Sequence, residues 1–98
     1  MRVYWREHKI GQQLILNSGT GEEEVVGTVR RTPSGFDAAA KTLGYEPGRS
    51  HKGFPSMEDA KAFVESFHPW DIYLPQELRQ HAEVEFDRTL HPIPEKNT

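Results

Sequence analysis

Residues 53–67, GFPSMEDAKAFVESF, carry a complete signal for one short amphipathic helix. The Ser56 hydroxyl can accept a hydrogen bond from a free backbone N–H group of the first turn. Asp59 follows three residues later, a spacing similar to that of a capping box. Apolar residues then recur along one side of the helix: Met57, Ala60, Phe63, Val64 and Phe67. We therefore predict a helix over 56–67 that covers an apolar surface formed elsewhere in the chain.

The residues before this helix predict the strands that it covers. Residues 2–8 and 12–17 are short runs of β-forming and apolar side chains, and residues 23–32 form the clearest strand pattern in the chain. The runs are separated by turn residues at 18–21 and 33–35, where glycine and proline permit a tight reversal. This arrangement indicates antiparallel strands joined by short connections.

Residues 36–43, FDAAAKTL, are compatible with two structures. Three consecutive alanines favour a helix. The preceding turn is of the hairpin type, and an isolated helix of about eight residues is marginal, which favours a strand running back along 23–32. We predict the strand and keep the helix as the alternative.

The second half of the chain carries weaker signals. Residues 44–53 contain three glycines and one proline and are predicted to be a loop. Pro75, Leu78, Ala82 and Phe86 have the spacing of a second helix, predicted over 75–88. The alternation of apolar and acidic residues over 82–86 favours a strand as the alternative.

The expected fold is therefore of the α+β class, an antiparallel sheet of three or four strands packed on helix 56–67. Residues 1–74 would form a single domain. Residues 75–90 would form a C-terminal helix that is packed on this domain or mobile, and residues 91–98 a disordered tail, because the end of the chain is rich in proline and polar residues.

Length and composition narrow the class of protein. The chain has 98 residues, of which 35% are hydrophobic and 28% charged, and it contains no cysteine. Disulfides and thiolate metal sites are thereby excluded, and a reducing cytoplasm is the expected compartment. No apolar run approaches the roughly 20 residues of a membrane span, and no signal peptide is recognisable. We expect a small bacterial or phage protein, monomeric and cytoplasmic, without membrane contact.

The sequence shows no constellation typical of an enzyme. Gly19-Thr20-Gly21 lacks the lysine and the later glycine of a phosphate-binding loop and reads as a hairpin turn. None of the five histidines has a recognised metal-ligand spacing. We therefore predict a protein that is not an enzyme and that has no cofactor and no metal.

Charge and aromatic residues indicate binding instead of catalysis. Residues 28–56 contain five basic and two acidic side chains, whereas residues 57–98 contain four basic and nine acidic ones. The basic residues of 28–53 and the aromatic residues of 68–73 give two candidate contact surfaces. The candidate binding residues are Arg30, Arg31, Lys41, Tyr45, Arg49, His51, Lys52, Trp70 and Tyr73.

Residues 12–67 also resemble known small modules. A G-F-x-A motif opens the strand predicted at 36–43, and G-F-P-S-x-E-D-A opens the helix. This order is similar to the arm-binding domain of phage integrases and to the DNA-binding domain of plant ethylene-response factors. The resemblance implies a three-stranded sheet on one helix, with the sheet contacting DNA. The same order is similar to the double-stranded-RNA-binding domain.

Two hypotheses for function follow. The leading one is a non-enzymatic protein-binding module whose partner is another protein, contacted by residues 44–53 or by Trp70 and Tyr73. The alternative is a nucleic-acid-binding accessory protein that uses the basic segment 28–53. Salt dependence separates the two, because binding to phosphates weakens steeply as salt is added.

Overall fold

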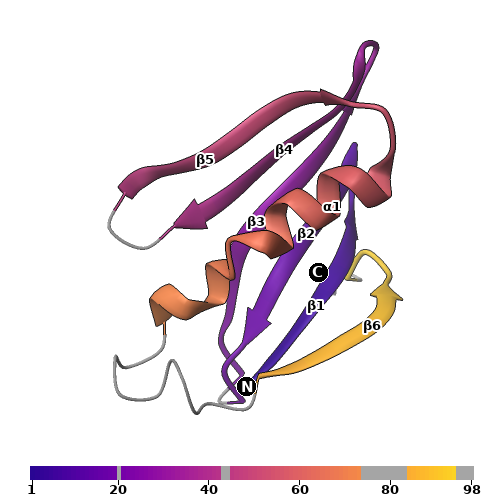
Figure 1. Ribbon diagram of the computed structural model, residues 1–98. Coiled ribbons are helices and arrows are strands. Elements are labelled where there is room, and N and C mark those ends of the chain that lie inside the picture. The colour runs from indigo at the N-terminus through magenta and orange to yellow at the C-terminus, as the bar shows by residue number, and fades with distance from the viewer. Residues whose placement is uncertain (20, 43–44, 74–83, 95–98) are drawn as a thin grey trace.

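The computed structural model describes residues 1–19, 21–42, 45–73 and 84–94 (Figure 1). These residues form six strands, one α-helix and one 3-10 helix. The strands are β1 (Arg2–His8), β2 (Gly11–Asn17), β3 (Glu23–Thr32), β4 (Gly35–Thr42), β5 (Tyr45–Phe54) and β6 (Glu85–His91). The helices are α1 (Met57–Ser66) and the 3-10 helix η1 (Pro69–Tyr73).

All six strands belong to one mixed sheet in the order β5-β4-β3-β2-β1-β6. Strands β1 to β5 form an antiparallel meander, and β6 adds in parallel to the outer side of β1. Figure 1 shows β6 beside β1, at the opposite end of the sheet from β5. The predicted antiparallel sheet of three or four strands is therefore wrong, because two further strands, β5 and β6, extend it at its two ends.

Helix α1 confirms the central prediction. It begins after Ser56, whose Oγ accepts a hydrogen bond from the Asp59 backbone N–H at 3.1 Å. Ala60 and Val64 are completely buried against the sheet, whereas Phe67 at the C-terminal end is 36% exposed. In the described ranges no helix is both long and apolar enough to span a bilayer.

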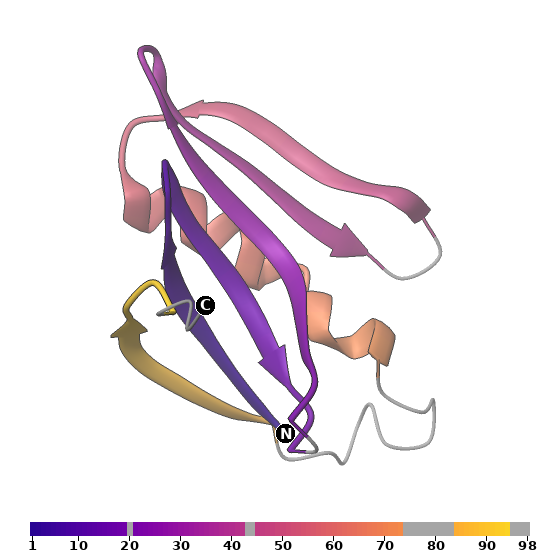
Figure 2. The ribbon, with the colours of Figure 1, turned by 180° about the vertical axis from the view of Figure 1, so that it is seen from behind.

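The helix lies on one face of the sheet, in front of it in Figure 1 and behind it in Figure 2. Side chains from β1 to β4 and from α1 form the core with Trp70 of η1. Its members are Val3, Trp5, Leu14, Leu16, Val26, Val29, Ala38, Ala40, Ala60, Val64 and Trp70. Among the described side chains of the two end strands, Phe54 of β5 and Phe86 of β6 are only partly buried against this core, so the core lies under the middle of the sheet.

The strand predicted at 36–43 is confirmed as β4. Ala38 and Ala40 are buried beneath α1, and Ala39 between them is exposed. This alternation is the period of a strand with one covered face. Small side chains on the covered face also leave room for the helix to approach closely.

The loop predicted at 44–53 is wrong where the chain is described, since residues 45–54 form β5, and Gly44 lies outside the described ranges. Gly48 and Gly53 have φ angles of 74° and 80°, and the pairing of β5 with β4 shifts register twice. Glycine adopts such positive φ angles without steric cost, so these residues bend an edge strand at its bulges and do not end it.

The helix predicted over 75–88 is wrong where the chain is described, because residues 85–91 form β6. Residues 74–83 lie outside the described ranges. Phe86 packs edge-on against Trp70, with ring centroids 5.9 Å apart, and this tertiary contact fits a strand at the sheet edge. The tail predicted over 91–98 begins with the last residue of β6, and residues 95–98 are again outside the described part.

The closest approach of α1 to the sheet is at Gly27 in β3. A Cβ atom added there would overlap Cγ1 of Val64 and lie 3.3 Å from the carbonyl oxygen of Ala39. Because Val64 is completely buried, it has no open space into which to retreat. Glycine at this position therefore sets the distance between the helix and the sheet.

We expect Gly27→Ala to lower the free energy of unfolding by about 1–3 kcal/mol, because it overpacks this contact. Truncation of the neighbour, Val64→Ala, would relieve the overlap. The double variant should therefore be more stable than the sum of the two single effects predicts, by about 1 kcal/mol. Urea unfolding of the four proteins measures this coupling. Strictly additive effects would show that the two residues do not define the packing distance.

Candidate binding surface at the β5 edge

The predicted binding residues lie on four elements. Arg30 and Arg31 are on β3, Lys41 is on β4, and Trp70 and Tyr73 are on η1. The remaining four all belong to β5: Tyr45, Arg49, His51 and Lys52. These four residues, predicted to lie on a contact loop, thus lie on a strand at the edge of the sheet.

Among the described strands, β5 has a neighbour on one side only. It pairs with β4, with His51 opposite Ala38, Ser50 opposite Ala39 and Arg49 opposite Ala40. In the described part of the chain no strand pairs with its other edge. An edge strand of this kind presents backbone N–H and C=O groups that a further strand can use.

The side chains of residues 49–52 on β5 are polar and exposed. Arg49, His51 and Lys52 are all exposed, and so is Ser50. From 48 to 54 no residue of the strand is buried. The nearest acidic residue on β4, Asp37, accepts a hydrogen bond from the Gly53 backbone N–H at 3.1 Å. Strands β5 and β6 are the two edge strands of the sheet, and β5 is the one that carries Arg49, His51 and Lys52.

Four rings form a continuous row from β5 to α1, which we call the aromatic row: His51, Phe54, Phe63 and Phe67. Successive ring centroids are 4.7 Å, 5.3 Å and 4.9 Å apart. Phe54 and Phe63 are half-buried, and Phe67 is exposed. The row was not predicted as a surface, because the helical stripe alone suggests that Phe63 and Phe67 are core residues.

Arg30 and Arg31 do not act as a pair. Arg30 lies opposite Asp37 and Arg31 lies opposite Phe36 in the register of β3 with β4. Both side chains are exposed, but successive residues of a strand project from opposite faces of the sheet. The two guanidinium groups therefore cannot bind one phosphate backbone from the same side.

The aromatic residues of η1 are engaged within the fold. Trp70 is only 8% exposed and packs against Phe86. Tyr73 is half-buried, and its hydroxyl accepts a hydrogen bond from Nζ of Lys41 at 2.7 Å. This hydrogen bond joins β4 to η1, so Lys41 already has a partner within the chain. Because Trp70 is almost completely buried, it offers no exposed anchor to a partner.

A second polar cluster lies at the other end of the sheet, on Tyr4, Arg6 and Glu23. The Tyr4 hydroxyl donates a hydrogen bond to Glu23, and Nη1 of Arg6 lies 3.0 Å from the same carboxylate oxygen. Burial raises the pKa of Tyr4, and the hydrogen bond to Glu23 raises it further. The cluster joins β1 to the start of β3. No pattern in the sequence indicates that these three side chains meet.

His91 and Asp87 extend this cluster onto β6. Nε2 of His91 lies 2.9 Å from Oδ2 of Asp87, and the His91 ring lies against the Tyr4 ring with centroids 4.2 Å apart. Residues four apart in a regular strand are separated by about 13 Å. They meet because the register of β6 with β1 shifts at this point. The hydrogen bond from His91 lowers the pKa of Asp87 to about 2, and a bond from Thr89 contributes.

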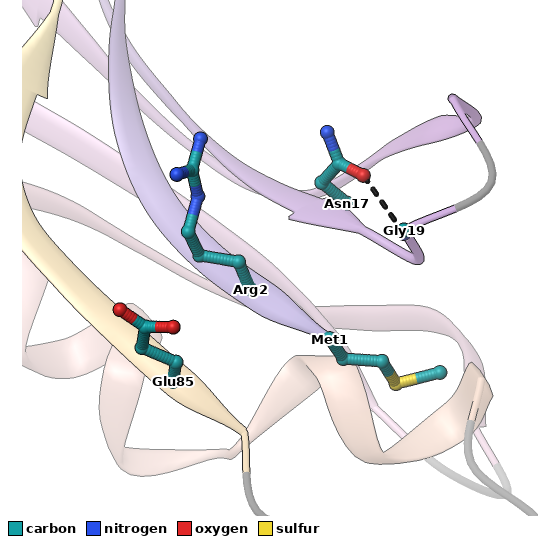
Figure 3. Close-up of a pocket in the computed structure, with 5 residues that line it drawn as sticks. All are labelled: Met1, Arg2, Asn17, Gly19 and Glu85. Carbon is teal, nitrogen blue, oxygen red and sulfur yellow. Dashed lines mark hydrogen bonds between the residues drawn. The ribbon is translucent and has the colours of Figure 1, made fainter.

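An open depression of about 270 Å³ lies where β1 and β6 begin, beside the end of β2 (Figure 3). It is lined by Met1, Arg2, Asn17, Gly19 and Glu85. The Asn17 side-chain oxygen accepts a hydrogen bond from the Gly19 backbone N–H at 2.9 Å, which closes the turn locally. The lining is shallow and its two charges are opposite in sign, so it resembles ordinary hydrated surface more than a ligand site.

Across the described residues no three histidine, aspartate or glutamate side chains converge as metal ligands. No known protein family, no curated protein and no solved structure matches this chain. The resemblance of residues 12–67 to DNA-binding modules therefore stays a prediction. The β5 edge, with its basic side chains and the aromatic row, is the surface best suited to a partner.

The Asp87 contact gives a prediction for acid. Its pKa in the folded chain is about 2, below its ordinary value of 3.8, so the ionised carboxylate stabilises the fold. This contribution is complete above about pH 4 and is lost as the pH falls toward 2. We expect Asp87→Asn to be less stable than wild type at neutral pH, with the difference vanishing near pH 2.

Denaturant unfolding at a series of pH values measures this difference. Glu22→Gln is the matched control, because it removes an exposed carboxylate from the turn between β2 and β3. The control should keep the acid-induced loss of stability seen in wild type. A constant gap between wild type and Asp87→Asn from neutral pH to pH 2 would contradict the prediction.

Proposed function

We propose that this protein is a non-enzymatic protein-binding module that receives its partner at β5. The observation that carries the proposal is the ten-residue edge strand itself, which is unpaired on one side within the described chain and has no buried side chain from 48 to 54. A partner strand added there gains backbone hydrogen bonds, the usual source of affinity when an extended peptide joins a sheet edge.

Charge determines which partners can approach this edge. Arg49, His51 and Lys52 are exposed along it, and Arg30 lies two strands away on β3. Such a basic edge attracts acidic segments and repels basic ones, and so contributes more to selection and association rate than to affinity. Pro47 has no backbone N–H, so the pairing surface is best at residues 48–54.

The same basic residues support nucleic acid binding less well. Neutralising a phosphate backbone requires several cations on one surface. Arg30 and Arg31 project from opposite faces, and Lys41 is hydrogen-bonded to Tyr73. Glu58 and Asp59 also place negative charge on the first turn of α1, where a phosphate would otherwise bind. These features favour a protein partner.

The test is a ¹⁵N NMR titration with two probes at low and moderate salt. One probe is an octapeptide of alternating glutamate and valine, and the other is a short DNA duplex. We expect the peptide to shift residues 48–54 and to slow hydrogen exchange of their outward-facing amides. We expect the duplex to give weaker shifts, without amide protection, that disappear with salt.

Charge reversal provides the matched variants. Lys52→Glu on β5 should weaken peptide binding by about threefold to tenfold, the scale of one exposed ion pair. Arg2→Glu makes the same charge change on β1, four strands away from β5, and should leave binding unchanged. Tight duplex binding with a steep salt dependence, or equal effects of the two variants, would exclude the proposal.

A further inference from the structure

We propose that the segment received at β5 is an acidic extended chain whose alternate side chains are apolar, and that these apolar side chains pack on the aromatic row. The inference rests on the proposed function and adds the chemistry of the partner. It follows from the apolar side of α1, because its aromatic residue Phe67 stays exposed beyond the side chains that the sheet covers.

The apolar stripe of α1 is wider than the surface that it covers. Ala60 and Val64 are completely buried against the sheet. Phe63 and Phe67, on the flank that faces β5, are only half-buried and exposed respectively. Residues four apart in a helix lie on the same side, so the two rings form one apolar strip along this flank.

Strand β5 reaches that strip through His51 and Phe54, whose rings pack on Phe63, while Phe67 stays exposed. Strand β4 is the last strand with buried side chains on this side of the molecule, and β5 has none from 48 to 54. One more strand beside β5 would lie next to the strip, since neighbouring strands are about 4.8 Å apart. Within the described part of the chain, Phe67 thus offers an exposed apolar ring that a further strand beside β5 could cover.

An added strand would present two kinds of side chain. Its residues alternate between the two faces of the sheet, so every second one would point toward α1. Those residues would meet His51, Phe54 and the strip on the helix, and apolar side chains suit that environment. The intervening residues would lie on the other face of the sheet, near Lys52, whose cation favours carboxylates. Arg49 pairs with Ala40, which is buried beneath α1, so the Arg49 side chain shares the helix side with His51.

A second copy of this chain fits the edge poorly. An antiparallel pairing of β5 with β5 centred between residues 50 and 51 would place Arg49 of each copy opposite Lys52 of the other, and like charges across a strand pair are destabilising. A nucleic acid duplex would contact the cations but offers no backbone to pair with a strand. An acidic partner segment can form hydrogen bonds with the backbone of β5 and can also offset the positive charge of its side chains.

The closing experiment compares three octapeptides by NMR with the wild-type protein. One alternates glutamate and valine, one alternates glutamate and serine, and one has four glutamates followed by four valines. We expect the alternating glutamate–valine peptide to bind about tenfold more tightly than the other two, because only it places apolar groups on one face. Protected amides on β5 would locate each peptide.

Variants of the row give the second comparison. Phe67→Ala should weaken the alternating glutamate–valine peptide by about fivefold and leave the glutamate–serine peptide unchanged, whereas Phe67→Leu should retain binding. Leu90→Ala is the matched control, because Leu90 is 42% exposed on β6 at the opposite edge of the sheet. The ¹⁵N spectra of the variants verify that the fold is intact.

The outcomes separate the two proposals. Equal binding of the glutamate–valine and glutamate–serine peptides at β5 would overturn the role of the aromatic row and leave the edge as the docking site. An unchanged affinity in Phe67→Ala would do the same. A failure of all three peptides to protect β5 amides, or protection at β6 instead, would overturn the proposed function together with this inference.

Discussion

The contact between Val64 and Gly27 determines how α1 lies on the sheet. Val64 is completely buried over a position of β3 where no Cβ fits. With this point fixed, the residues on either side of Val64 project toward opposite ends of the sheet. Phe63 faces β5 and contacts His51 and Phe54, and Glu65 faces β1. One close approach therefore positions both flanks of the helix.

The two flanks differ in chemistry. On the β1 side, one Glu65 oxygen accepts a hydrogen bond from Nε1 of Trp5 at 3.0 Å and the other lies 2.6 Å from Nη1 of Arg88. Lys61 lies over the Trp5 ring, and burial lowers the pKa of this lysine. On the β5 side the helix presents aromatic rings. The flank of the helix on the β1 side is covered by specific polar contacts. The flank on the β5 side leaves an aromatic ring accessible to an apolar group.

Local signals were sufficient for most of the meander and for the helix. The Ser56 cap and the spacing of Ala60 and Val64 specify α1 without reference to the rest of the chain. For β4, the hairpin turn at 33–35 and the shortness of the segment outweigh the helix preference of three alanines. In α1 the pattern of burial coincides with the intrinsic preferences of the residues, so a reading of the sequence identifies the correct element.

The strands at the two ends of the sheet could not be recognised in this way. Strand β5 buries no side chain from 48 to 54, so it lacks the apolar alternation by which strands are identified, and its glycines at 48 and 53 imitate a loop. Strand β6 depends on contacts of Phe86 and Arg88 with distant residues. The candidate binding surface was predicted only in part for the same reason, since its cations were recognised and its aromatic row was not.

The parallel pairing of β6 with β1 has a consequence for the order of folding. Each hairpin from β1 to β5 brings together neighbouring segments, whereas Arg2 pairs with Glu85 from nearly the opposite end of the sequence. Closing so long a loop is entropically costly and slow relative to hairpin formation. Val3, Tyr4 and Trp5, among the most deeply buried residues, thus belong to a strand whose outer neighbour arrives last. During synthesis, β1 is therefore made before the other strands of this sheet and is the last to have a neighbour on both sides.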